Sequence, residues 1–78
     1  MKTVKILGPG CANCRKLEAA ARDAAASAGI EAAFVKVTDV NEIVAHDVLA
    51  TPGLVIDGKL VSSGRIPTQA EIRKWMEA

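Results

Sequence analysis

The segment LVIDGKLV, residues 54–61, limits the possible folds of this chain more than any other. Two short apolar runs flank the dipeptide Asp57-Gly58. An Asp-Gly pair in this setting favours the two-residue turn of an antiparallel hairpin. The sequence therefore predicts two antiparallel strands in the second half of the chain.

Extended and helical patterns alternate before this hairpin. Residues 3–7 (TVKIL) predict a strand, because β-branched and apolar residues recur there. After the Gly-Pro-Gly break at 8–10, apolar residues spaced three and four apart predict a helix that ends at Gly29. We expect the following residues on its buried face: Cys14, Leu17, Ala21, Ala24 and Ala28.

Two shorter helices are predicted in the remaining chain. Residues 30–37 read as a second strand, and Asp39 with Glu42 resembles a capping box that opens a short helix. We expect this helix region to bury Val40, Ile43, Val44 and Val48. Thr68 and Glu71 form a second capping-box pattern. The helix that follows should bury Ile72, Trp75 and Met76.

These elements predict an α/β fold in the order β-α-β-α-β-β-α. Strands separated by helices should run parallel, because a crossover helix returns the chain to the same end of the sheet. The hairpin then adds antiparallel strands. We expect a mixed four-stranded sheet with helices on both faces, formed by one domain that spans residues 1–78.

Composition excludes several classes of function. The formal net charge is +1, and Phe34 and Trp75 are the only aromatic residues, so we expect no nucleic-acid binding. No run approaches the roughly 18 apolar residues of a membrane helix, so we expect no membrane partner. The N-terminus lacks a signal-peptide pattern, and we therefore expect a cytoplasmic location. We also expect a monomer and no cofactor.

The chain has two cysteines, Cys11 and Cys14, at C-x-x-C spacing. Cys11 should begin a helix directly after a strand, where the helix N-terminus lowers the pKa of a thiol below about 8.5. Cys14 lies one turn later and should face the sheet. An exposed thiolate that attacks, followed by a buried thiol that resolves the mixed disulfide, suits thiol–disulfide exchange.

Other interpretations of the cysteine pair remain open. Both residues could be small core side chains, although Gly8-Pro9-Gly10 makes burial of Cys11 difficult. Gly-x-x-Cys-Ala-Asn-Cys also resembles the loop of small copper-chaperone domains, and two thiolates suit Cu(I). Those domains, however, end on a strand and usually have Met where this chain has Pro9.

A Zn(II) site would need four ligands, and His46 alone could help the two cysteines. A non-catalytic redox-sensing module is a further alternative.

Taken together, these motifs resemble the thioredoxin superfamily, especially its small single-domain redox-active disulfide proteins of bacteria and archaea. The resemblance spans the whole chain and rests on Cys11-Ala12-Asn13-Cys14, on Thr51-Pro52 and on the Asp57-Gly58 hairpin. It implies a thiol–disulfide oxidoreductase with catalytic Cys11 and Cys14. Protein disulfides would be its substrates, and a flavoprotein similar to thioredoxin reductase its electron donor.

The resemblance also implies a substrate surface formed by Gly10, Thr51 and Pro52. The Thr51-Pro52 peptide bond would be cis, and the Thr51 backbone would pair with a substrate peptide as an added strand. No residue is implied as a metal ligand.

Three departures from the family pattern are visible. Gly10 replaces the usual aromatic residue before the first cysteine, and Ala-Asn replaces Gly-Pro between the cysteines. The first strand has Lys2 and Lys5 but no acid, so proton transfer from Cys14 must use water or another group. A glutathione-binding pattern is absent from residues 62–65 (SSGR), and we expect Arg65 and His46 to be surface residues.

Overall fold

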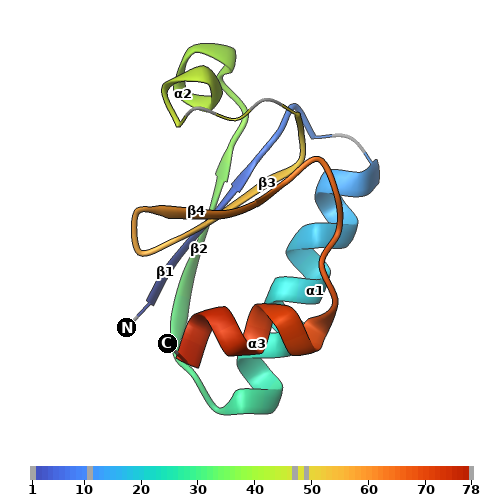
Figure 1. Cartoon of the computed structure of the whole chain (residues 1–78), viewed down its shortest axis with the longest axis vertical. Helices are drawn as coiled ribbons and strands as arrows, with labels where there is room; N and C mark the ends of the chain where they lie inside the picture. Colours follow the sequence, from blue (N-terminus) through green and yellow to red (C-terminus); the bar gives the residue numbers. More distant parts are fainter. Residues whose placement is uncertain (1, 11, 47, 49, 78) are drawn as a thin grey trace.

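The computed structural model describes residues 2–10, 12–46, 48 and 50–77 (Figure 1). Its elements follow the predicted order. They are β1 (Lys2–Leu7), α1 (Ala12–Ala28), β2 (Ala32–Val37), α2 (Val40–Ala45), β3 (Gly53–Ile56), β4 (Lys59–Ser63) and α3 (Gln69–Glu77). The fold class is therefore confirmed as α/β with a mixed four-stranded sheet, although β2 begins two residues later than expected.

The strands lie in the order β2-β1-β3-β4. β1 and β2 pair in parallel, as predicted for a crossover through α1. The same expectation for the crossover through α2 is wrong, because β3 runs antiparallel to β1. α2 has six residues and rises only about 9 Å, whereas a strand of six residues spans about 20 Å. β3 begins at the same end of the sheet at which β2 finishes, since Val37 and Gly53 both pair with Leu7.

The predicted hairpin joins β3 to β4. Asp57 and Gly58 both have positive φ, +50° and +82°, which is the conformation of the tight turn that Asp-Gly favours. The Asp57 carboxylate accepts a hydrogen bond of 2.9 Å from the N–H of Thr3 and lies 3.3 Å from Lys2 Nζ. The turn is thus attached to the start of β1.

One face of the sheet is covered by α1 and α3, which lie against each other across it (Figure 1). Leu17 of α1, Leu54 of β3, and Ile72 and Met76 of α3 are fully buried between the layers. Ala21 and Ala24 of α1 are also fully buried in this core. Trp75 is only partly buried at the edge of this core.

The other face has a smaller core beneath α2. Leu7, Val37, Ile43 and Val55 form it, with Val48 and Leu60 packed alongside. Of the valines expected in this core, Val40 and Val44 are instead 68% and 62% exposed. A six-residue helix makes fewer than two turns, and α2 buries Ile43 alone.

The capping predictions differ in outcome. Thr68 and Glu71 form a full capping box, in which Thr68 Oγ1 accepts from the N–H of Glu71 and the Glu71 carboxylate accepts from the N–H of Thr68. Asp39 caps α2 by accepting from the N–H of Asn41.

In the part of the chain described here, no helix is long and apolar enough to cross a membrane.

Candidate active site

The site lies where β1 ends and α1 begins. Cys11 falls outside the described residues, so its predicted role remains a prediction. Cys14 lies in the first turn of α1 and is 5% exposed, as the spacing predicts. Leu17, three residues later on the same face, is fully buried and holds this side of the helix against the sheet.

Gly8 connects Cys14 to a distant segment of the chain. Its N–H donates a hydrogen bond of 2.9 Å to the carbonyl of Val37, which fixes the end of β1 beside β2. A Cβ atom placed on Gly8 would overlap Cys14 Sγ and would lie 3.8 Å from Thr51 Cβ. The Cys14 sulfur therefore occupies the space that a side chain at position 8 would fill, and Thr51 borders the same space.

The Thr51-Pro52 peptide bond is cis in the structure. Thr51 is exposed and Pro52 is buried, so the segment presents Thr51 to solvent. The carbonyl of Pro52 accepts a hydrogen bond of 2.9 Å from the N–H of Gly64, which ties this segment to the loop after β4. Thr51 thus lies near Cys14, although some 40 residues separate the two in sequence, and Pro52 follows it in the chain.

A small pocket of about 30 Å³ opens beside Cys14. That volume exceeds the roughly 10–15 Å³ needed to hold one water molecule. Gly10, which has a φ of +89° and is exposed, lines this pocket together with Cys14. The remaining lining residues are Ile6, Gly8, Arg15, Glu18, Lys36 and Thr38.

The chain as a whole is similar to known proteins. The family model for the thioredoxin domain matches residues 2–77. The chain belongs to the thioredoxin family. It is 42% identical over 74 residues to a thioredoxin of Methanothermobacter thermautotrophicus, a match that covers 95% of this chain and 96% of that protein. It is 40% identical over 78 residues to a thioredoxin of Methanocaldococcus jannaschii, covering 100% of this chain and 90% of that protein. We conclude that it is a thioredoxin-type redox protein.

Sequence reasoning missed Glu18, the acid of this thioredoxin pocket. Its side chain is 15% exposed, with Oε1 lying 3.2 Å from Lys36 Nζ and Oε2 lying 3.0 Å from Arg22 Nη2. Partial burial works to raise the pKa of this carboxyl. Hydrogen bonds and charges from Arg22 and Lys36 outweigh that effect, and the pKa lies below its ordinary value. The carboxylate is therefore ionised at neutral pH.

A signal for Glu18 was present in the sequence. It follows Cys14 by four residues, so both side chains lie on adjoining turns of one helix face. Arg22 follows by four more residues and completes an i,i+4 ion pair. The Arg22 guanidinium also lies 4.6 Å from the centre of the Phe34 ring. This cation–π contact joins α1 to β2 in addition to the ion pair between Glu18 and Lys36.

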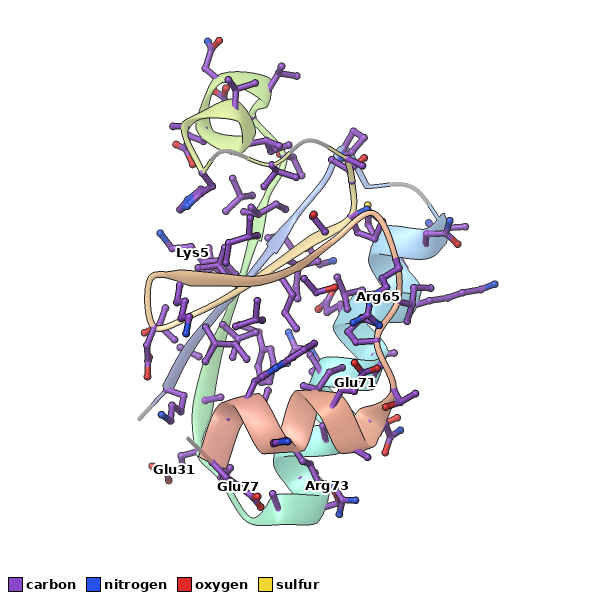
Figure 2. All side chains as sticks on the ribbon, viewed as in Figure 1. Lys5, Glu31, Arg65, Glu71, Arg73 and Glu77 are labelled. Atoms are coloured by element: carbon purple, nitrogen blue, oxygen red, sulfur yellow. The ribbon has the colours of Figure 1, made fainter. Side chains whose placement is uncertain are left out.

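Arg65 and His46 lie elsewhere. Arg65 is exposed, as expected, but it donates hydrogen bonds of 3.2 and 3.0 Å to the two carboxylate oxygens of Glu71 (Figure 2). His46 is half-buried rather than fully exposed and caps the end of α2 with its backbone N–H. Within the described residues, no group of three or more His, Cys, Asp or Glu side chains is arranged to hold a metal ion.

Proposed function

We propose that this protein is a thiol–disulfide oxidoreductase that exchanges the Cys11–Cys14 dithiol with protein disulfides. One observation supports the proposal most directly. The sulfur of Cys14 is buried at the end of β1, beside the exposed Thr51 of the Thr51-Pro52 segment. A resolving thiol needs this position, because it must be protected from outside disulfides and yet close to the bound substrate.

The proposed reaction has two steps. The Cys11 thiolate attacks a substrate disulfide, one new S–S bond forms, and the first substrate sulfur leaves with the electron pair of the broken bond. Cys14 then attacks the Cys11 sulfur, the Cys11–Cys14 disulfide forms, and the second substrate sulfur leaves. The Cys14 proton ends on that leaving thiolate. The dithiol is oxidised by two electrons and the substrate disulfide is reduced by two.

Gly10, Thr51 and Pro52 are proposed as the substrate surface. Gly10 and Thr51 are exposed on the two segments that adjoin Cys14, and neither presents a large side chain to an approaching peptide. An extended substrate could then pair with the Thr51 backbone as an added strand. The flavoprotein electron donor, the cytoplasmic location and action as a one-domain monomer of residues 1–78 belong to the same proposal.

Trapping of partners tests the proposal. Cys14→Ser should accumulate mixed disulfides through Cys11, since the chain has no third cysteine to release them. Cys11→Ser should trap few partners, because Cys14 is buried. A thiol-reversible set of proteins captured by Cys14→Ser alone supports exchange, and equal behaviour of the two variants contradicts it.

Two assays of the wild-type protein complete the test. Reduction of insulin disulfides with dithiothreitol as the electron source should proceed. Titration of the reduced protein with Cu(I) and Zn(II) should show only weak, non-stoichiometric binding. Tight stoichiometric Cu(I) binding without insulin reduction would favour a metal carrier, and the absence of both would favour a redox-sensing module.

A further inference from the structure

Gly8 is a buried glycine whose backbone does not require glycine. Its φ lies outside the left-handed region, unlike that of Gly10. An alanine could therefore adopt the same backbone conformation without strain. Any steric conflict with a side chain at position 8 must therefore involve neighbouring atoms and not the backbone conformation of Gly8.

The conflict at Gly8 involves one atom. An added Cβ would overlap Cys14 Sγ, but it would lie 3.5 Å from Cys14 Cβ and 3.8 Å from Thr51 Cβ. The last two separations are ordinary van der Waals contacts. We use the term sulfur seat for the space between Gly8, Cys14 and Thr51 that Cys14 Sγ occupies.

We propose that Gly8 is a positioning residue, which leaves the sulfur seat open and so directs Cys14 Sγ for the resolving step. This inference rests on the proposed function, since it assigns Gly8 a role in that reaction. The residue has no reactive group and acts only through the position of the sulfur.

The sulfur, rather than the strand, would yield to an added methyl group. The N–H of Gly8 is bonded to the carbonyl of Val37, and Leu7 before it is fully buried, so the end of β1 is fixed from both sides. Cys14 Sγ turns about a single bond and can rotate to another staggered position. That rotation would move the sulfur out of the seat.

Release of a chromogenic thiolate measures the resolving step. Reduced protein mixed with 5,5′-dithiobis(2-nitrobenzoate) should release one aryl thiolate when Cys11 attacks and a second when Cys14 displaces it. In Gly8→Ala we expect the second release to be about tenfold to a hundredfold slower, because a misplacement of about 1 Å can cost a reaction that much. The first release should change little.

Gly29→Ala is the matched control. Gly29 ends α1 at the far end from the site, has a φ of +67° and has no atom near an added Cβ. Alanine there is destabilising through its backbone alone. This variant should lose stability and still release the second thiolate at the wild-type rate, which separates misplacement of the sulfur from a general loss of stability.

A double-mutant cycle tests the seat without any redox reaction. Gly8→Ala should lower the midpoint of thermal unfolding by about 5–15 °C, as expected for overpacking in a small domain. In a Cys14→Ala background, where the sulfur is absent, most of that loss should disappear. If Gly8→Ala fails to fold and the double variant folds, the seat is equally supported.

Either of two results would overturn the inference. The first is that Gly8→Ala has the same effect on stability in both backgrounds, whether an equal loss or a failure to fold. The second is that the rate of the second thiolate release is unchanged in Gly8→Ala. If the wild-type protein gives no second release, the proposed function fails, while the cycle still decides whether Gly8 sets the place of the sulfur.

Discussion

The Glu18 carboxylate on α1 lies 3.2 Å from the Lys36 ammonium on β2. This pair joins the helix that carries Cys14 to the edge strand of the sheet, and both residues line the pocket beside the sulfur. The Lys36 side chain is 64% exposed, so an ion pair with it alone would add little to stability. The Glu18 side chain is largely shielded from water and also forms an ion pair with Arg22. The two cations thus serve to keep one shielded carboxylate in place.

Glu18→Gln should weaken this attachment of α1 to β2. We expect the free energy of unfolding to fall by about 1 kcal/mol at neutral pH and low salt, the upper range for ion pairs that are not fully buried. The difference from wild type should shrink in 1 M NaCl, since salt screens charges that face solvent. Urea unfolding at both salt concentrations measures it. Glu31→Gln, an exposed acid before β2 (Figure 2), is the control, and an equal effect there would contradict the prediction.

Glu71 should make stability depend on acid pH. Hydrogen bonds from Arg65, followed by one from the N–H of Thr68, lower the pKa of Glu71 from 4.5 to about 2. Because the folded pKa is lower than the unfolded value, the stabilisation is complete above about pH 4.5. It is lost as the pH falls from there towards 2.

Glu71→Gln isolates this contribution, since glutamine can still accept the capping hydrogen bond from Thr68. Thermal unfolding should show the variant less stable at pH 7, with a difference from wild type that shrinks as the pH falls towards 2. Glu77→Gln, which removes an exposed acid near the other end of α3 (Figure 2), is the control for the loss of one negative charge. A constant difference across the pH range for Glu71→Gln would refute the assignment.

The two thiols should differ in their reaction with iodoacetamide. In Cys11→Ser the remaining Cys14 is 5% exposed, so we expect alkylation at least about tenfold slower in the folded protein than in urea. Cys11, measured in Cys14→Ser, should react faster than Cys14 at neutral pH, as the sequence predicts for a thiol at a helix N-terminus. Mass spectrometry over a time course provides both rates. Faster reaction at Cys14 would reverse the proposed order of attack.

Two neighbours on α2 should respond oppositely to truncation. Ile43 is 7% exposed and packs on the second core, so Ile43→Ala should cost about 2–4 kcal/mol. Val44 is 62% exposed, and Val44→Ala should be neutral or stabilising by a few tenths of a kcal/mol, because alanine is the better helix former. Chemical unfolding of both variants checks this, and similar losses would show that Val44 is buried in solution.

Local patterns predicted most of the fold. Asp57-Gly58 determined its own turn, and the apolar spacing of α1 correctly placed Cys14 and Leu17 in the core. These features depend on residues that are neighbours in sequence. The direction of β3 was mispredicted because it depends on the end of the sheet to which the connection between β2 and β3 leads the chain, which a local pattern does not specify.

The surroundings of the site were harder to predict, since they depend on tertiary contacts. The sequence indicated Thr51 and Pro52 only through a family resemblance, and it gave no reason for Gly8 to lack a side chain. That reason appears when the end of β1, the first turn of α1 and the Thr51 segment are placed together. Val40 and Val44 were expected in the core for a related reason, because spacing shows that a face is apolar but does not show what covers it.

The central position of β1 in the sheet affects when the surroundings of Cys14 form during folding. β1 pairs with β2, about 30 residues later, and with β3, about 50 residues later. The sulfur seat needs Thr51, so it cannot form until the longer of these loops has closed, which is the slower event for a folding chain. Before that closure Cys14 lacks the part of its surroundings that Thr51 supplies. We therefore expect Cys14 to become fully protected from alkylation only after β3 has paired with β1, so that its alkylation rate during refolding follows this late step.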